Sequence, residues 1–246
     1  NSIQHKIWFF HNMILPKNNP DIILFWTPTI DLVELINNIK LFYKNKIFLH
    51  NWDPTFTQID HQHWKDSEII LLNNSKIVDC VFTVNPLEVE FYEKNGCRGI
   101  HCYSGFDDNF SKPCFDEKYK CDVSAVITNL YNDSIWDINK QKINRKTLID
   151  QLYNNKSINL HIYGNENIKN AYPDSYKGFI SYNNCNKVFS NSSINLCIHA
   201  ISIDGYLSER AAQIIGSGGL LFTDNEIGIG FIPGIDYELV HNSETA

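Results

Sequence analysis

The chain has 246 residues, 43% of them hydrophobic and 13% aromatic, which is ample for a packed core. No run approaches the roughly 18 to 20 consecutive apolar residues that span a bilayer, and the first residues lack the pattern of a signal peptide. The net charge of −7, with lysines interspersed among carboxylates, argues against nucleic acid as the main partner. We therefore expect a soluble, cytoplasmic protein with no transmembrane segment and no nucleic-acid partner.

Cysteine and histidine usage indicates neither a disulfide framework nor a metal site. The seven cysteines are an odd number and contain no CxxC pair, so reduced thiols are expected. His61 and His63 are separated by one residue, which points them to different sides of a helix, and no further ligand has a suitable spacing. Solvated histidines are the simpler interpretation, and no metal is predicted.

The first part of the chain alternates short apolar runs with amphipathic segments, which predicts strands joined by helices. Asn85 followed by Pro86 is typical of a helix N-cap with proline at the first helical position, and Gly96 is expected to end that helix. The expected strands are residues 21–26, 46–50, 79–84 and 99–103, and the expected helices are residues 29–43, 64–73 and 86–95.

A second alternating series follows a polar stretch at residues 104–120, which contains Gly and Pro without periodicity. We place the domain boundary there, with an N-terminal domain at residues 1–105 and a C-terminal domain at residues 106–246. Strands separated by helices require right-handed crossovers and covered parallel sheets, so the predicted fold class is α/β with two Rossmann-like domains. In the second series the expected strands are residues 121–128, 158–164, 177–181, 193–200 and 219–224, and the expected helices are residues 143–154 and 183–191.

The segment from residue 203 to residue 225 places Gly205 just before a predicted helix that begins near Tyr206. Unpaired N–H groups and the positive end of the helix dipole would then point out of the carboxyl edge of the sheet, where ligands of such folds bind. A phosphate or diphosphate fits this position, and Arg210 can add a charge-assisted hydrogen bond. Gln213 lies further along the same stripe, and its amide suits sugar hydroxyl groups.

A less specific interpretation of this segment is also open. Asp204 is then only a helix N-cap, and Arg210 pairs with Glu209 or Asp224 on the surface. In both interpretations, residues 218–219 end the helix with a left-handed turn, so that the chain can return at once as a strand.

Residues 204–224, DGYLSERAAQIIGSGGLLFTD, resemble the C-terminal signature of the group 1 glycosyltransferases related to the spore-maturation glycosyltransferases. Upstream segments resemble other parts of this family in the same order, so the similarity covers roughly residues 76 to 240. The resemblance implies a GT-B fold in which the second domain holds a nucleotide sugar and the acceptor lies in the cleft. It also implies metal-independent transfer, with no cofactor other than the nucleotide-diphosphate sugar as co-substrate. The family's opening Gly-rich loop and closing helices are missing here, so the N-terminal domain is expected to be incomplete.

The resemblance further implies roles for single residues. Arg210 would neutralise the leaving phosphates, and Gln213 stands where the family usually has a Glu that binds the ribose hydroxyls. Gly164 and the main chain of Phe179 and Ile180 would border the nucleobase. The residues implied at the donor site are Gly164, Phe179, Ile180, Asp204, Gly205, Tyr206, Leu207, Ser208, Arg210 and Gln213.

Other side chains are candidates for catalysis or for phosphate binding. His50 and Asp53 follow a first-domain strand and are candidates for the general base of the acceptor, although a turn capped by Asp53 explains the same pattern. His199 either contacts the sugar or is a hydrogen-bonded core histidine. Three basic residues either assist phosphate binding or form a charged helix face: Lys142, Arg145 and Lys146.

The predicted function is that of a hexosyltransferase-type glycosyltransferase, which moves a sugar from a nucleotide-diphosphate donor to an unknown acceptor. The main catalytic effect is expected to be stabilisation of the leaving group by Arg210 and by the N–H groups at the start of the helix. The alternative is a catalytically inactive nucleotide-sugar-binding module, and Gln213 favours it. A GT-B sugar epimerase is a third possibility. The sequence leaves the sugar, the nucleobase and the acceptor open.

Overall fold

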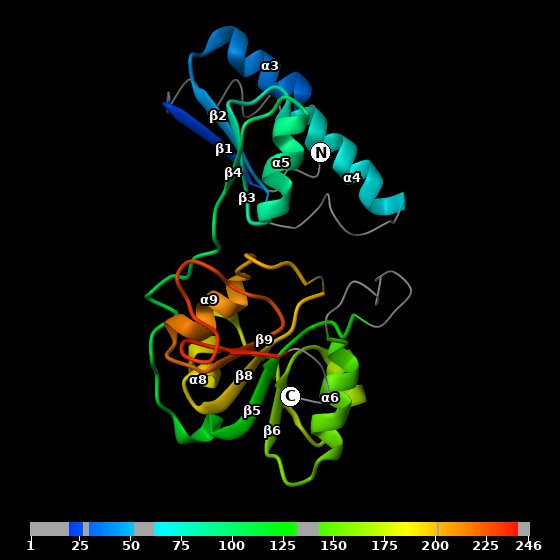
Figure 1. Ribbon diagram of the computed structural model, residues 1–246, viewed down its shortest axis with the longest axis vertical. Coiled ribbons are helices and arrows are strands. Elements are labelled where there is room, and N and C mark those ends of the chain that lie inside the picture. Colours follow the sequence, from blue (N-terminus) through cyan, green and yellow to red (C-terminus); the bar gives the residue numbers. More distant parts are fainter. Residues whose placement is uncertain (1–19, 27–29, 52–61, 132–142, 201, 241–246) are drawn as a thin grey trace. The chain divides into compact units, whose positions relative to one another are not determined.

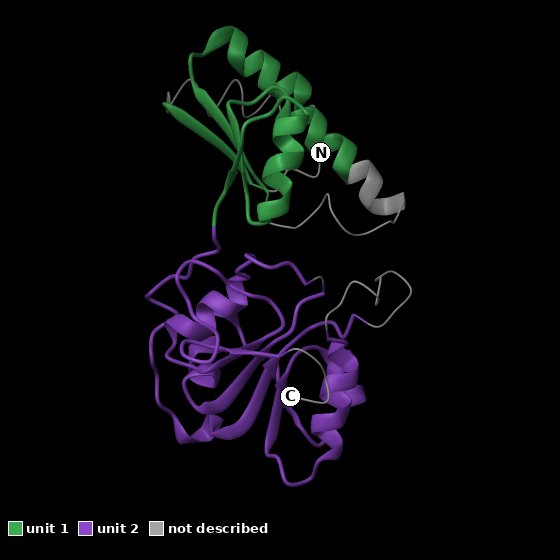
Figure 2. Cartoon of the chain, viewed as in Figure 1, with its two compact units in different colours: residues 1–102 green, residues 103–246 purple. Residues whose placement is uncertain are grey.

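The computed structural model describes residues 20–26, 30–51, 62–131, 143–200 and 202–240. The chain divides into two compact units, Asn1–Cys102 and Tyr103–Ala246, which Figure 2 shows in different colours. The sequence predicted this boundary a few residues later, after residue 105. Each unit contains a parallel sheet with helices, which is the predicted α/β class.

Unit 1 contains a four-stranded parallel sheet whose strand order follows the chain. Right-handed crossovers between strands that are added in one direction place the connecting helices on one face of the sheet. Figure 1 shows these helices as α3, α4 and α5. The strands are β1 (Ile22–Trp26), β2 (Lys46–Asn51), β3 (Cys80–Thr83) and β4 (Gly99–His101), and the helices are α3 (Val33–Phe42), α4 (Gln62–Ser75) and α5 (Pro86–Lys94).

The two faces of the unit 1 sheet differ in how well they are covered. Because successive side chains of a strand point to opposite faces, Ile23 and Ile47 share one face and pack against Ile36 of α3. On the opposite face of β1, three apolar side chains are between 50% and 60% exposed: Ile22, Leu24 and Trp26.

Helix α5 begins and ends where the sequence predicts. The side chain of Asn85 accepts a hydrogen bond from the N–H group of Leu87, and Pro86 occupies the first helical position. Gly96 adopts a left-handed conformation with a φ of 77°, which a residue with a side chain rarely adopts.

Unit 2 contains a six-stranded parallel sheet with the order β10-β9-β8-β5-β6-β7. The chain starts at β5, adds β6 and β7 on one side, and then returns to β8 beside β5 before it continues outward. This reversal makes the junction of β5 and β8 a topological switch point, where open α/β sheets bind ligands. The strands are β5 (Cys121–Val126), β6 (Leu160–Tyr163), β7 (Tyr176–Gly178), β8 (Ser192–Cys197), β9 (Leu221–Thr223) and β10 (Glu238–Leu239).

Helices cover both faces of this sheet. Ile162 of β6 packs with Leu148 of α6, whereas the next residue, Tyr163, faces the opposite layer with Val188 of α8 and Ile214 of α9. Figure 1 shows α6 beside β5 and β6, with α8 and α9 near β8 and β9. The helices are α6 (Arg145–Asn154), α7 (Glu166–Ala171), α8 (Cys185–Phe189) and α9 (Glu209–Gly216).

The sequence predicted most of these elements and missed two. Helix α7 has six residues, which is too short to display an apolar period, and β10 has two. Strand β7 ends at Gly178, so Phe179 and Ile180 lie in the loop that follows it. All seven cysteines are free thiols.

Candidate functional site

The carboxyl ends of the unit 2 strands gather most of the predicted residues at one edge. All strand pairs of this sheet are parallel, so the residues that follow the strands lie on the same side. Gly164 follows β6, Phe179 follows β7, His199 lies just beyond β8, and Asp224 follows β9. The fold therefore brings together residues that are far apart in the sequence.

Helix α9 begins later than the sequence predicts. Its first residue is Glu209, and Ser208 is the N-cap, whose hydroxyl oxygen accepts a hydrogen bond from the N–H group of Ala211 at 3.3 Å. Tyr206 lies before the helix, and its N–H group donates to the carbonyl oxygen of Ile203. The predicted helix start near Tyr206 is thus wrong, because Ser208 supplies the side-chain cap that Tyr206 lacks.

The start of α9 nevertheless keeps unpaired donors. Among the described residues, no acceptor is found for the main-chain N–H groups of Ser208, Glu209 and Arg210. These groups carry the positive end of the helix dipole. At the other end, Gly218 has a φ of 71°, and the N–H group of Gly219 donates to the carbonyl of Ile214, so the predicted left-handed end of the helix is confirmed.

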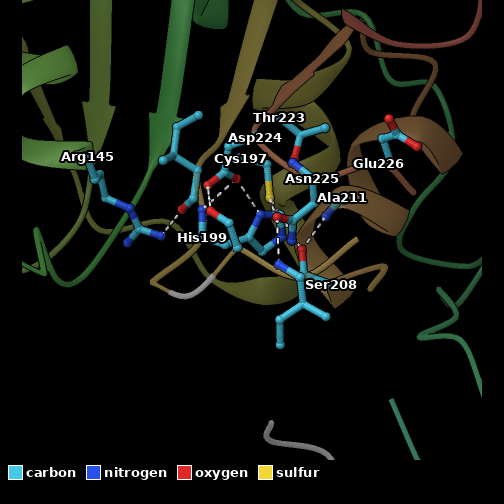
Figure 3. Close-up of polar contacts among 12 residues, drawn as sticks. Arg145, Cys197, His199, Ser208, Ala211, Thr223, Asp224, Asn225 and Glu226 are labelled. Carbon is cyan, nitrogen blue, oxygen red and sulfur yellow. Dashed lines mark hydrogen bonds and ion pairs between the residues drawn. The ribbon is translucent and has the colours of Figure 1, made fainter. Parts of the chain in front are cut away.

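The loop before α9 is fastened to the loop after β9. The N–H group of Ile203 donates to Oδ1 of Asn225 at 3.0 Å, and the N–H group of Gly205 donates to the carbonyl of Glu226 at 2.7 Å. In return, the N–H group of Glu226 donates to Oδ1 of Asp204 at 3.2 Å. Gly205 has a φ of 83°, so glycine suits this turn. Figure 3 shows Asn225 and Glu226 close to the start of α9.

A buried ion pair lies under this loop. Nδ1 of His199 is 2.7 Å from Oδ1 of Asp224, and the two side chains are at most 8% exposed. Burial alone lowers the pKa of His199, but Cys197 and the Asp224 carboxylate outweigh it and raise the pKa to about 9. Burial likewise opposes ionisation of Asp224, and His199 overcomes it, so the pKa of Asp224 is lowered. His199 is therefore a paired core histidine, and its ring contacts that of Tyr206 edge-on at 5.4 Å.

Arg145 is buried at the switch point, which neither sequence interpretation anticipated. Its guanidinium group donates to the carbonyl oxygens of Asn129, which follows β5, and Ile198, which follows β8. The side chain is 5% exposed, and its Nε atom makes no hydrogen bond to any residue that the structure describes. Within those same ranges no carboxylate pairs with it, although buried charges are usually paired. Figure 3 shows Arg145 directed toward the end of β8.

Two predicted residues of α9 lie near this cation. Arg210 is half-buried. Burial lowers the pKa of Arg145, and the charge of Arg210 lowers it further, so the two guanidinium groups interact. The alternative in which Arg210 pairs with Glu209 or Asp224 is not observed in the described parts of the chain. Gln213 is 6% exposed, and its side-chain amide lies within reach of the hydroxyl group of Tyr182.

The loops after β6 and β7 form the other end of the edge. A side chain at Gly164 would place its Cβ atom 2.2 Å from the carbonyl oxygen of Ile127, so only glycine fits there. Phe179 is 75% exposed, and Ile180 is half-buried. Tyr182, which the sequence did not single out, lies beside α9. Burial and a hydrogen bond to Glu209 raise its pKa.

Leu207 and Lys146, two further candidates from the sequence, make contacts that stabilise the fold. The Leu207 side chain is buried in the core with Ala211 and Ile214, so only its main chain faces a ligand site. Lys146 pairs with Asp150 on the surface of α6, which matches the interpretation as a charged helix face. Lys142 lies outside the described residues.

In unit 1, His50 lies near the carboxyl end of β2. It stacks on Trp26 with ring centroids 4.4 Å apart, and its Nε2 atom is 3.5 Å from the sulfur of Cys102. Burial lowers the pKa of His50, which favours the neutral form that a general base needs. Asp53 lies outside the described residues. Over the described ranges, no cluster of three or more His, Cys, Asp or Glu side chains has the arrangement of a metal site.

Comparisons with known proteins agree with this architecture. Residues 142–246 match the model of the family described as Glycosyl transferase-like, whereas no curated protein matches the chain. HepE of Anabaena, solved in complex with UDP and glucose, is 11% identical with a TM-score of 0.61, and the match covers 100% of this chain and 70% of that one.

Two further solved structures give similar values. Trehalose-6-phosphate synthase OtsA is 11% identical with a TM-score of 0.55, and the match covers 89% of this chain and 61% of that one. The UDP-forming α,α-trehalose-phosphate synthase of Burkholderia xenovorans is 10% identical with a TM-score of 0.52, and the match covers 89% of this chain and 62% of that one. The chain thus spans between 61% and 70% of the length of these structures.

The parallel sheets and these likenesses define the fold as that of the GT-B glycosyltransferases. The match of residues 142–246 to the Glycosyl transferase-like model agrees with the resemblance of the sequence to the group 1 glycosyltransferases. No helix in the described ranges is both long and apolar enough to cross a bilayer.

Proposed function

We propose that the chain binds a nucleotide-diphosphate sugar at the carboxyl edge of the unit 2 sheet and transfers the sugar to an acceptor without a metal ion. The observation that supports this proposal most strongly is the burial of Arg145 at the switch point. A buried guanidinium group is costly unless its charge is balanced, and here two main-chain carbonyls hold it at the switch point. A diphosphate at this point would supply the balancing negative charge.

A second cation and the start of α9 support the same ligand. Arg210 adds a positive charge near Arg145, and the N–H groups of Ser208, Glu209 and Arg210 are available to phosphate oxygens. Because charge develops on the leaving diphosphate during transfer, preorganised donors here would stabilise the transition state. No step in this scheme requires a metal ion.

The remaining contacts suit the rest of the donor. Gln213 is buried beside Tyr182, and an amide there can donate to one ribose hydroxyl group and accept from the other. The main chain of Gly164, Phe179 and Ile180 would border the nucleobase. Asp204, Gly205 and Tyr206 would lie near the transferred sugar, with Leu207 contributing only its main chain.

Unit 1 would bind the acceptor, and His50 or Asp53 would act as the general base. Neutral His50 at the end of β2 suits that role. The proposed location is the cytoplasm, where free thiols stay reduced.

The proposal is tested by calorimetry with UDP, GDP, ADP and dTDP in the presence of EDTA, followed by hydrolysis of the matching glucose donor. At least one diphosphate is expected to bind. Arg210→Ala is expected to lower the turnover number about 10²-fold or more, whereas Arg210→Lys retains part of the activity. Unchanged turnover in Arg210→Ala would contradict the assigned role.

A catalytically inactive nucleotide-sugar-binding module is the second candidate, because Gln213 lacks the negative charge of the family's Glu. Binding of a diphosphate without turnover, with or without added acceptors, would favour the module. A GT-B epimerase would instead convert the donor to a second nucleotide sugar without an acceptor.

A further inference from the structure

The loop of residues 202–207 contains no helix or strand, yet three consecutive residues after β9 hold it along most of its length. Asn225 and Glu226 bind Ile203, Asp204 and Gly205 through the main-chain and side-chain hydrogen bonds described above. Asp224 is the first of the three, and none of the roles proposed above uses it.

The Asp224 carboxylate is fully buried and accepts three hydrogen bonds. Oδ1 accepts from the N–H group of His199 at 3.0 Å and from its Nδ1 at 2.7 Å, and Oδ2 accepts from the hydroxyl group of Ser202 at 2.6 Å. Since a carboxylate only accepts, Nδ1 of His199 carries the proton in this contact. Asp224 thus joins the end of β8 to the first residue of the loop.

The ring of His199, which Asp224 holds in place, in turn contacts the loop at Tyr206. It contacts the ring of Tyr206 edge-on, with centroids 5.4 Å apart and an interplanar angle of 66°. Asp224 therefore fixes the loop at Ser202 directly and at Tyr206 through His199. Between these points, Asn225 and Glu226 hold the remaining residues.

We propose that Asp224 is a positioning residue for sugar transfer, which acts through His199 and Ser202 to hold the loop of residues 202–206 against the sugar and the diphosphate. This inference rests on the proposed function and adds a residue that does not itself touch the donor. The proposal assigns the nucleobase contacts and the contacts at the reacting centre to different parts of unit 2. Nucleobase contacts come from the loops after β6 and β7, whereas the contacts at the reacting centre depend on Asp224.

The test compares Asp224→Ala with Asp224→Asn in the full chain. UDP binding is measured by calorimetry, hydrolysis of UDP-glucose by steady-state kinetics, and folding by the melting temperature. Asp224→Ala is expected to lower kcat about 10²-fold, because small misplacements at a reacting centre have effects of this size, while the Kd for UDP changes by less than about threefold. The amide of Asp224→Asn retains an acceptor for His199, so at least about tenfold of the lost kcat is expected to return.

Asp122→Asn is the matched control. Asp122 accepts a main-chain hydrogen bond from Asn159 at the opposite edge of the same sheet, so the same substitution there should leave kcat unchanged. Equal kcat in Asp224→Ala and wild type overturns the inference. A parallel loss of UDP affinity, kcat and melting temperature, without rescue by Asp224→Asn, also overturns it, because Asp224 then has only a structural role.

If Asp224→Ala does not fold, Ser202→Ala decides the question. This change removes the hydrogen bond to Oδ2 of Asp224 and leaves the buried ion pair in place. A fall in kcat of about fivefold or more at constant UDP affinity supports the inference, and an unchanged kcat overturns it. A wild-type protein that binds none of the four diphosphates contradicts the proposed function itself, which distinguishes the two failures.

Discussion

The ring of Tyr131 lies against the guanidinium group of Arg145, with 4.1 Å between the guanidinium carbon and the ring centroid. Tyr131 has a φ of 52°, a left-handed conformation that is uncommon for residues other than glycine. The ring of Tyr131 and the carbonyl oxygens of Asn129 and Ile198 thus stabilise the positive charge of Arg145 in a buried position. Strain of this kind is often found next to binding sites.

Removal of this cation should weaken diphosphate binding. Arg145→Ala is expected to lower the affinity for UDP about tenfold to a hundredfold, since hydrogen bonds to charged groups contribute about 1.5 to 3 kcal/mol. Calorimetry measures the effect. Lys146→Ala is the control, because the neighbouring Lys146 pairs with Asp150 on the surface and should be replaceable without loss of affinity.

Stability at acidic pH should depend on His161. Burial, followed by the charge of Lys177, lowers the pKa of this histidine. The unfolded chain therefore binds a proton below about pH 6.5 that the folded chain does not, so acidification through this range favours unfolding. In His161→Gln, the fall in melting temperature between about pH 7.5 and about pH 5.5 should be smaller than in wild type. An equal fall in both proteins would show that His161 contributes nothing to this pH dependence.

The close packing at Gly164 predicts a sharp contrast between two glycines. A Cβ atom at Gly164 would lie 2.2 Å from the carbonyl oxygen of Ile127, and main-chain atoms cannot move aside cheaply. Gly164→Ala is expected to destabilise the protein by about 1 to 3 kcal/mol. A Cβ atom at Gly105 meets no atom of the described residues within 4 Å, so Gly105→Ala should have little effect. Denaturant titration of the two variants compares them, and equal stabilities would argue against the close contact at Gly164.

Ile229 is expected to be a site of stabilisation. It has a φ of 57° between two glycines that are also left-handed, although a β-branched side chain disfavours this conformation by roughly 1 to 2 kcal/mol. Asn tolerates it better, so Ile229→Asn should raise the melting temperature. Ile232 is similarly exposed and is not left-handed, so Ile232→Asn should give no such gain. A gain in both variants would point to removal of an exposed apolar residue rather than to relief of strain.

The order and type of most elements follow from local pattern alone. Asn85 and Pro86 predicted the start of α5 correctly because capping is a contact between neighbours in sequence. The start of α9 was predicted too early because Leu207 is apolar and fits the helical spacing, although its burial in the core comes from the loop. Helix α7 escaped detection because its six residues contain a single buried apolar side chain, Ile168.

The site was less predictable, because its decisive features are contacts over long sequence distances. The sequence left Arg145 open to two interpretations, phosphate binding or a charged helix face, and only the return of β8 beside β5 shows that it is buried. The sequence singled out His199 but gave no means of choosing between core and ligand contact, since its partner Asp224 lies on another strand end. The sequence did predict Arg210 and Gln213 as site residues, because their helical spacing places them on the same side of one helix.

The fastening of residues 202–205 to residues 224–226 has a consequence for how the protein matures. During synthesis, the loop leaves the ribosome before the residues that fix it, so its final shape waits for the strand that follows. A nascent chain that ends before Glu226 can already contain β5 to β8, but the hydrogen bonds between Glu226 and the loop cannot yet form. The capacity to hold a ligand with this loop would then arise only once residues 224–226 have taken their places after β9.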